Sequence, residues 1–326
     1  MKKRMQKYLV MAIALAFSAT MLAGPALKEA AAQDKYPSRA VEYIVGYGAG
    51  GGSDQLARKS GFLIEKVLGV PFPVLNVPGA TGGTAITKLL AAPADGQSIV
   101  VYIADSHAVL ATGGASWKMS DLMPVARLML VPSFLFVSEK SRFNSWSDFE
   151  KEAKAKPGTL KVGTVGFGSV DDITLTYMEG KGVKIIQVPY PNRSEGYAAC
   201  IGNHVDAMYE QAGDVRQYIN SKQMRPILIF GDKRLPAFKD VPCSKEAGYD
   251  IGLPQFRSVA VKAGTDPSKV KILSDAFEKV AATPEFKAFL EEQYATADSF
   301  MNHEVCTKYI LSELDTMTKT WGAKKK

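Results

Sequence analysis

The chain has 326 residues, 46% of them hydrophobic, which is enough to build two α/β domains of ordinary size. Its formal net charge is +7, but residues 1–32 carry five basic side chains and one acidic side chain, so about +3 remains for the rest. Such a mild and scattered positive charge argues against a nucleic-acid partner.

The first 32 residues have the three-part pattern of a secretory signal peptide. Four basic residues within 1–7 precede the apolar run YLVMAIALAFSATMLAG, and Ala30 and Ala32 place small residues before a cleavage point. A membrane anchor is the alternative, but the apolar run is short for a spanning helix. We therefore expect cleavage near Ala32 and an exported mature protein.

Strand-like and helix-like segments alternate from residue 41 onward. Residues 41–47 are predicted to form a buried strand, and residues 53–68 have the apolar spacing of a helix. A strand over 72–77 and a helix over 82–92 follow, and a third strand is predicted over 97–104. This βαβαβ order predicts parallel strands with right-handed crossovers.

A second α/β series begins with the strand-like segment VPSFLFVS. The next helix is predicted to begin at Ser145, a capping residue, and to end before Pro157. A last strand over 256–263 precedes a mostly helical remainder from Pro267. Between them we predict strands over 160–165, 184–190, 205–210 and 225–230, with helices starting near Asp171, Ser194 and Asp214.

Four of these strands end in loops rich in glycine, proline, serine or asparagine. Two of the loops, 48–54 and 78–83, belong to the first series, and two, 164–171 and 189–194, belong to the second. In open α/β sheets, ligands bind outside the carboxyl ends of the strands. The distribution therefore predicts one ligand held between two lobes.

The loop sequence GYGAGGGSD contains five glycines and invites two interpretations. A dinucleotide fingerprint is one, but the strand that follows ends in Asn76-Val77-Pro78-Gly79 and lacks the acid that would bind a ribose. An anion site is the other, because glycines let backbone N–H groups approach a guest, and the helix starting near Ser53 adds a positive dipole end. The plain alternative is a tight turn in which Asp54 caps its own helix.

The histidines and cysteines give no sign of a metal site or of a disulfide framework. His107, His204 and His303 lie far apart in the sequence, and so do Cys200, Cys243 and Cys306. There is no G-x-S-x-G elbow either, so an exported hydrolase remains a weak alternative. We expect no cofactor, no metal and no enzymatic activity.

Seven stretches, taken together and in order, resemble the receptors of tripartite tricarboxylate transporters, also called Bug receptors. They cover nearly all of the expected mature chain: YPSRAVEYIVGYGAGGGSDQLAR, VLNVPGATGGTAI, ADGQSIVVYIADSHAVL, DLMPVARLMLVPSFLFV, AKPGTLKVGTVGFGS, VPYPNRSEGYAACIGNHVDAMYEQ and DVPCSKEAGYDIG.

This resemblance implies a bilobed type II periplasmic-binding-protein fold, with two α/β domains, a hinge and a ligand cleft between them. It implies lobe 1 over 33–132 plus 255–326 and lobe 2 over 133–254, with crossovers near 131–134 and 253–259. It also implies a monomeric periplasmic receptor for a small carboxylate-bearing solute. The implied partners are two membrane subunits of a transporter, one large and one small. A receptor that presents its solute to a membrane sensor is the alternative.

The resemblance also implies which residues contact the solute. In lobe 1 these are Tyr47, Gly50, Gly51, Gly52, Ser53, Asp54, Gly79, Ala80, Thr81 and Gly82, and in lobe 2 they are Thr164, Gly166, Gly168, Ser169, Tyr190, Arg193, Ser194 and Glu210.

Several of these positions depart from the pattern of the family. Arg193 is displaced from the usual position of the basic residue; it is either a clamp for a second carboxylate or a solvated loop residue. Asp171 and Asp172 stand where the family is commonly neutral, and an acid there would repel a carboxylate or attract an amino group. The alternative is that one of the two is simply the N-cap of its helix. The identity of the solute therefore stays open between aliphatic acids, aromatic acids and amino acids.

Overall fold

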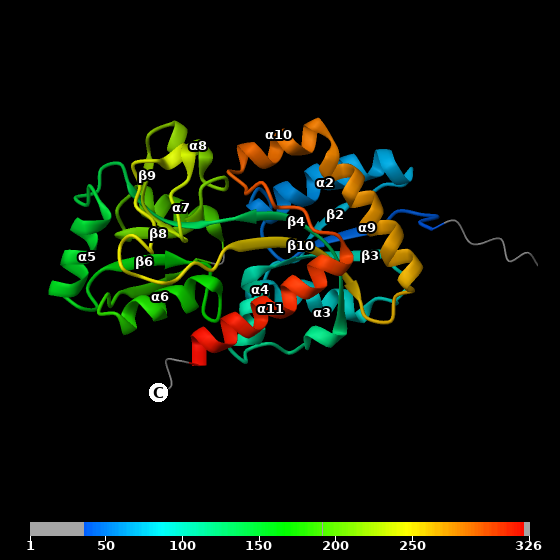
Figure 1. Ribbon diagram of the computed structural model, residues 1–326, viewed down its shortest axis with the longest axis horizontal. Helices are drawn as coiled ribbons and strands as arrows, with labels where there is room; N and C mark the ends of the chain where they lie inside the picture. Colours follow the sequence, from blue (N-terminus) through cyan, green and yellow to red (C-terminus); the bar gives the residue numbers. More distant parts are fainter. Residues whose placement is uncertain (1–35, 191, 323–326) are drawn as a thin grey trace, which may run out of the picture. The chain divides into compact units, whose positions relative to one another are not determined.

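The structure is a computed structural model that describes residues 36–190 and 192–322 (Figure 1). The predicted signal peptide, 1–32, lies outside the described residues. All described helices and strands lie within residues 39–322, and the strands form two five-stranded mixed sheets with helices around them. This confirms the predicted class of two α/β domains.

The first sheet begins with the predicted βαβαβ unit. Its strands lie in the order β2-β1-β3-β10-β4, and they are β1 (Glu42–Val45), β2 (Val74–Asn76), β3 (Ser98–Ile103), β4 (Leu122–Val131) and β10 (Gln255–Lys262). β1 pairs in parallel with β2 and β3, whereas β10 is antiparallel to β3 and β4. Parallel neighbours need crossover connections, which helices supply here. The helices of this part are α2 (Gly52–Leu68), η1 (Ala80–Gly82), α3 (Gly83–Ala91), α4 (Ala104–Ala111), η2 (Met119–Asp121), α9 (Pro267–Ala282), α10 (Pro284–Glu292) and α11 (His303–Gly322).

The second sheet repeats this mixed design. Its order is β7-β6-β8-β5-β9, formed by β5 (Ser133–Ser138), β6 (Lys161–Thr164), β7 (Ile186–Pro189), β8 (Ala207–Gln211) and β9 (Met224–Phe230). β6 is parallel to β7 and β8, and β5 is antiparallel to β8 and β9. Its helices are α5 (Trp146–Ala155), α6 (Val170–Gly180), α7 (Arg193–Ile201), α8 (Arg216–Asn220) and η3 (Pro236–Phe238).

The chain passes between the two sheets twice. It leaves the first sheet at Val131 and enters the second at Ser133, and it returns in the segment between Phe230 and Gln255. The sequence pattern does not predict β4, because Pro124 and Arg127 interrupt its apolar run. In the structure, a single residue joins β4 of the first sheet to β5 of the second.

Two of the predicted helix caps differ from the structure. Ser169 is the N-cap of α6, and its hydroxyl accepts a hydrogen bond from the Asp172 amide. The interpretation of Asp171 or Asp172 as the cap is therefore wrong; both lie in the first turn. Asp54 does not cap α2 either, because Gly51 holds that position. Ser145, in contrast, caps α5 as predicted.

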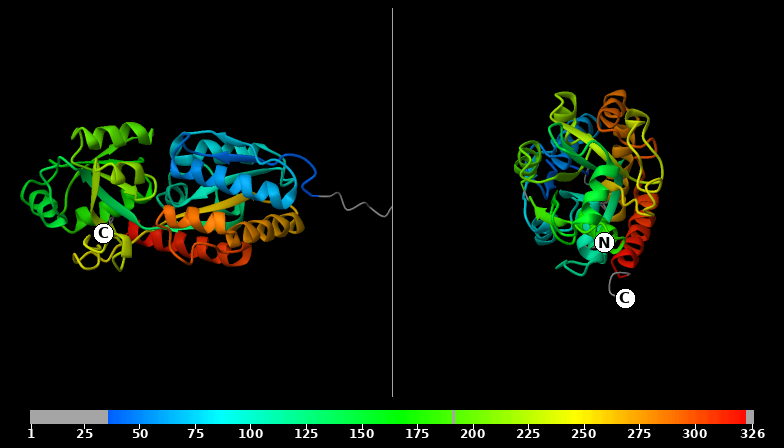
Figure 2. Two further views of the ribbon diagram at one scale, coloured as in Figure 1. Left: turned by 90° about the horizontal axis from the view of Figure 1, so that it is seen from above. Right: turned by 90° about the vertical axis from the view of Figure 1, so that its left-hand side faces the viewer.

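The first sheet with its helices is one group of elements, and the second sheet with its helices is the other. The C-terminal helix α11, drawn in red in Figure 2, contacts β4 and α4 of the first group and α6 of the second. His107 on α4 joins α4 to α11. Its ring accepts a hydrogen bond from the Tyr102 hydroxyl at Nδ1, 2.8 Å away, and donates from Nε2 to the carbonyl of Ile310, 2.9 Å away. Burial lowers the pKa of His107 to about 4, so the ring is neutral in the folded protein.

Within the described residues, no helix is both long and apolar enough to cross a bilayer.

Candidate functional site

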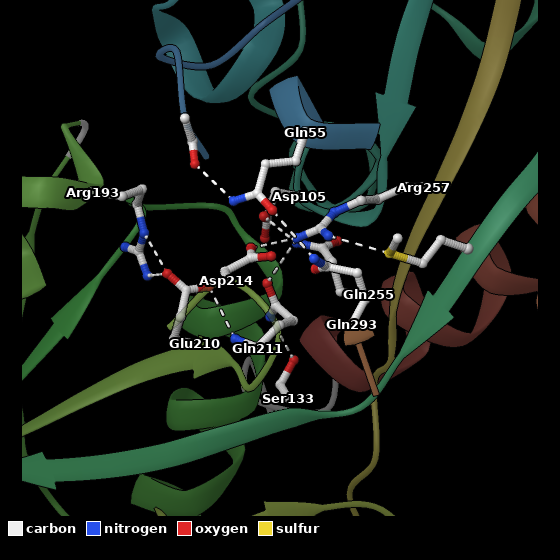
Figure 3. A network of polar contacts seen from close by, with 12 residues as sticks. Gln55, Asp105, Ser133, Arg193, Glu210, Gln211, Asp214, Gln255, Arg257 and Gln293 are labelled. Carbon is white, nitrogen blue, oxygen red and sulfur yellow. Dashed lines mark hydrogen bonds and ion pairs between the residues drawn. The ribbon is translucent and has the colours of Figure 1, made fainter. Parts of the chain in front are cut away.

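A cavity of about 570 Å³ lies where loops from both sheets meet. The first sheet contributes the glycine loop and the start of α2, together with the residues that follow β3 and those that begin β10. The second contributes the residues after β6 and β8 and the start of α7. Figure 3 shows the polar side chains that converge here from both groups of elements. The position agrees with the rule that ligands bind at the carboxyl ends of parallel strands.

The glycine loop and the first turn of α2 form one wall of the cavity. Gly50, Gly51, Gly52 and Ser53 all line it, as does Tyr47. Gly51 has an extended conformation and no side chain caps the helix, and the first N–H groups of a helix have no partner within it. The Gly50 and Gly51 amides are used within the loop, so this wall offers a solute the amides of Gly52 and Ser53 and the positive end of the helix dipole.

Asp54 shapes the glycine loop from behind and does not line the cavity. Its carboxylate accepts a hydrogen bond from the Gly50 amide at 2.9 Å and from Asn76 at 3.0 Å, and it pairs with Arg58 at 2.9 Å. Burial raises the pKa of Asp54, but the hydrogen bonds from Arg58, Gly50 and Asn76 outweigh it, so the pKa is below its usual range. The observed contacts match a loop-shaping role, and a contact with the solute stays a prediction.

The second loop, Gly79 to Gly82, lies next to Tyr47. The Tyr47 hydroxyl donates to the Thr81 carbonyl at 3.2 Å and also contacts Ser106. Ala80 and Thr81 have positive φ angles of 49° and 52°, an unusual backbone for residues other than glycine. None of the four residues of this loop lines the cavity, so their contact with a solute also stays a prediction.

Five of the predicted residues between Thr164 and Tyr190 do not line the cavity. Ser169 is occupied as the cap of α6, and Tyr190 lies against Gly163 and Gly196. Gly166 has a φ of 151° and lies close to Thr81, so the two loops adjoin. The predicted residues that do not line the cavity in this part of the chain are Thr164, Gly166, Gly168, Ser169 and Tyr190; those that line it are Arg193, Ser194 and Glu210.

Arg193 is not a solvated loop residue, because it is largely buried in an ion pair, and its role as a clamp for a solute stays a prediction. Its Nη2 lies 2.6 Å from Glu210 Oε2 and its Nε lies 2.9 Å from the same oxygen. The Tyr197 hydroxyl donates to that oxygen as well, at 2.8 Å. Burial lowers the pKa of Arg193, but Glu210 more than offsets it, so the guanidinium stays charged.

A second buried ion pair joins the two groups of elements. Arg257 on β10 lies 2.5 Å from Asp214, which follows β8, and their side chains are 3% and 7% exposed. Both side chains lie directly over Gly52, where there is no room for a Cβ atom. Gly52 is therefore required by this contact and not only by the shape of its loop.

Two further carboxyl groups, those of Asp105 and Asp171, line the cavity. Asp105 accepts hydrogen bonds from the Val170 amide at 3.1 Å and from Gln255 at 2.5 Å. Asp171 accepts one from the Val165 amide at 2.7 Å. Burial is the main reason why the pKa of each is above its usual range, and the charge of Asp105 raises that of Asp171 further.

The predicted set lacks several side chains that line the cavity: Asp105, Asp171, Tyr197, Gln211, Asp214, Gln255, Arg257 and Gln293. Two signals in the sequence point to some of them. Asp105 and Asp214 follow the carboxyl ends of β3 and β8, the edge where ligands bind. Arg257 is a charged residue inside an apolar strand, a position that needs a partner.

The described residues include no group of three or more histidine, cysteine, aspartate or glutamate side chains placed to hold a metal ion. Cys200, Cys243 and Cys306 are all free thiols and all buried.

The model of the tripartite tricarboxylate transporter family receptor matches residues 56–319. A protein encoded in the gbd 5' region of Cupriavidus necator is 32% identical over 279 residues, which are 84% of each chain. Protein BugT of Bordetella pertussis is 29% identical over 268 residues, 78% of this chain and 81% of BugT.

Among solved structures, MatC from Rhodopseudomonas palustris with bound malate has a TM-score of 0.81 at 23% identity. The match covers 88% of this chain and all of MatC, and it shows that the fold is shared. The matched family is one of transporter receptors and not of enzymes. The chain therefore belongs to the receptor family of the tripartite tricarboxylate transporters.

Proposed function

We propose that this receptor captures a small carboxylate-bearing solute between its two lobes and delivers it to a tripartite tricarboxylate-type membrane transporter. The main support is the wall formed by Gly50 to Ser53, where a helix of 17 residues begins at the cavity without a side-chain cap. A carboxylate accepts hydrogen bonds from such amides and is stabilised by the helix dipole. The related structure with malate supports the same class of solute.

We propose residues 33–132 plus 255–326 and residues 133–254 as the two lobes. The short connection between β4 and β5 and the return before β10 are then the hinge segments. Because both lobes line the cavity, a solute that contacts both favours the closed arrangement over an open one. In this proposal the partners are one large and one small membrane subunit, and the receptor acts as a monomer in the periplasm after cleavage near Ala32.

Thermal unfolding of residues 33–326 tests the proposed class of solute. The protein is first unfolded and refolded to remove any bound solute, and then melted with aliphatic carboxylates, aromatic carboxylates, amino acids and NAD. A ligand at about 100 times its Kd adds about 2.7 kcal/mol to the free energy of unfolding. In a chain of this size the midpoint then rises by roughly 5–10 °C. A rise with NAD alone, or with none of the carboxylates and amino acids, would overturn the proposal.

A further inference from the structure

Three ion pairs account for every arginine that lines the cavity, and no lysine lines it. Arg193 pairs with Glu210 at 2.6 Å, and Arg257 pairs with Asp214 at 2.5 Å. The third pair, Arg216 with Glu292 at 2.9 Å, is more exposed. In each of these pairs the positive charge of the arginine is neutralised by one carboxylate.

Asp105 and Asp171 remain outside these pairs. Among the described residues, neither carboxyl group lies within ion-pair distance of a basic side chain, and their hydrogen-bond donors are two backbone amides and the side-chain amide of Gln255. The second oxygen of Asp171 receives no hydrogen bond from the part of the chain that the structure describes. The cavity thus has two carboxyl groups more than it has basic groups to neutralise them.

Several buried polar atoms on side chains that line the cavity have no hydrogen-bond partner among the described residues. In the described part of the chain, Gln255 Oε1 and Asp214 Oδ1 are acceptors without a donor, on side chains that line the cavity and are more than nine-tenths buried. Arg193 Nη1 and Arg257 Nε are donors without an acceptor. Buried polar atoms are normally paired, so both donors and acceptors remain unsatisfied on the described side chains around the cavity.

We propose that Asp105 and Asp171 form a subsite for a protonated amino group, so that the solute is a small amino acid. Its carboxylate lies at the amides of Gly52 and Ser53 and its ammonium group lies between the two carboxyl groups. An ammonium group supplies up to three N–H donors and the positive charge that the lining lacks. The proposal rests on the proposed function and narrows the class of solute.

The titration of Asp105 and Asp171 predicts the direction in which the affinity for a solute changes with pH. Burial holds the pKa values of Asp105 and Asp171 high in the cavity, where Tyr47, Tyr209, Arg193 and Glu210 also face them. A bound ammonium group favours the ionised carboxylates, so binding releases protons and its affinity rises with pH. A solute with a carboxylate alone is repelled by the same ionised groups, and its affinity falls with pH.

Matched pairs of solutes test the proposal by titration calorimetry: aspartate with succinate, glutamate with glutarate, alanine with propionate and phenylalanine with 3-phenylpropionate. We expect at least one amino acid to bind more than about tenfold more tightly than its partner without the amino group. Its affinity should increase from about pH 5 to about pH 7. These two measurements need only the native sequence, so they do not depend on how a variant folds.

The variant Asp171→Asn keeps the side-chain shape and an acceptor for the Val165 amide. We expect it to reduce the preference for the amino acid by about tenfold or more, whereas the control Asp232→Asn, at a 78% exposed side chain, leaves the preference unchanged. Equal or tighter binding of the partner without the amino group, with affinity falling as pH rises, would overturn the subsite and leave the proposed function intact. Binding of neither member of any pair would count against the proposed function itself.

Discussion

Arg193 and Glu210 form an ion pair whose side chains are 14% and 5% exposed, so neither partner is easily removed alone. The variant Glu210→Gln leaves a buried guanidinium without its counter-charge. We expect it to lower the free energy of unfolding by about 3–5 kcal/mol, measured by denaturant unfolding. The control Glu246→Gln breaks a solvent-exposed pair with Arg234 and should change the free energy little. Similar effects of the two variants would show that the pair at the cavity is not held as described.

His107 makes the protein sensitive to acid. Its folded pKa of about 4 is below the unfolded value of 6.5, so the unfolded chain binds the proton more tightly between these values. The stability that depends on neutral His107 is therefore complete above about pH 6.5 and is lost as the pH falls, by about 3 kcal/mol near pH 4.

We expect the variant His107→Gln to be less stable than the native protein at neutral pH and to show a weaker loss between about pH 6.5 and about pH 4. Thermal unfolding at several pH values measures this difference. The exposed His204 gives the control, because His204→Gln should keep the pH dependence of the native protein. An unchanged pH dependence in His107→Gln would contradict the prediction.

At the scale of the elements, the two N-cap serines Ser169 and Ser145 differ in their hydrogen bonds and in their distance from the cavity. Ser169 caps α6 next to the cavity and also donates to the Gly166 carbonyl at 2.6 Å, whereas Ser145 caps α5 within a capping box with Asp148. Each substitution by alanine should cost about 1 kcal/mol of stability. Only Ser169→Ala should also weaken solute binding, because it releases the turn that places Asp171. Calorimetry and denaturant unfolding on both variants separate the two effects, and equal loss of affinity in both would contradict this role.

The elements themselves were largely predictable from the sequence. Helix α2, for example, follows from its apolar spacing and its glycine loop, and β1, β2 and β3 follow from short apolar runs bounded by turns. β4 could not be predicted in this way, because a proline and a buried arginine interrupt its apolar pattern. The contacts that allow an arginine at this position come from a distant part of the chain. Arg127 donates from Nε to the carbonyl of Ser299, 172 positions away.

The candidate site was predictable only in part, for a similar reason. Local glycine patterns identify Gly50, Gly51 and Gly52, which line the cavity. The pair of Arg257 with Asp214 depends on elements that are brought together only by the fold, and neither residue belongs to a local motif. Periodicity reports burial along one element and carries no information about which charges face each other across a cavity.

At the scale of the whole receptor, contacts across the cavity join the two groups of elements. The Asp214 and Arg257 side chains meet over Gly52, and the Val170 amide reaches Asp105. We expect the variant Gly52→Ala to keep the lobes apart, because its Cβ atom would overlap both side chains of the pair.

Small-angle scattering with and without a bound amino acid or carboxylate measures this effect. The radius of gyration of the native protein should decrease on binding, whereas that of Gly52→Ala should not. Gly48→Ala is the matched control, because its Cβ atom meets open space in the same loop. Equal compaction of Gly52→Ala and the native protein would contradict this account of closure.

The three thiols have a practical consequence for following that motion in solution. Cys200, Cys243 and Cys306 are buried, and burial raises the pKa of Cys200 and of Cys306 to about 12, so little reactive thiolate is present at neutral pH. Two cysteines introduced on the surface, one on each side of the cavity, would therefore accept fluorescent dyes ahead of the native ones. The native cysteines of the folded receptor would thus interfere little with labelling, which is what an optical sensor for its solute requires.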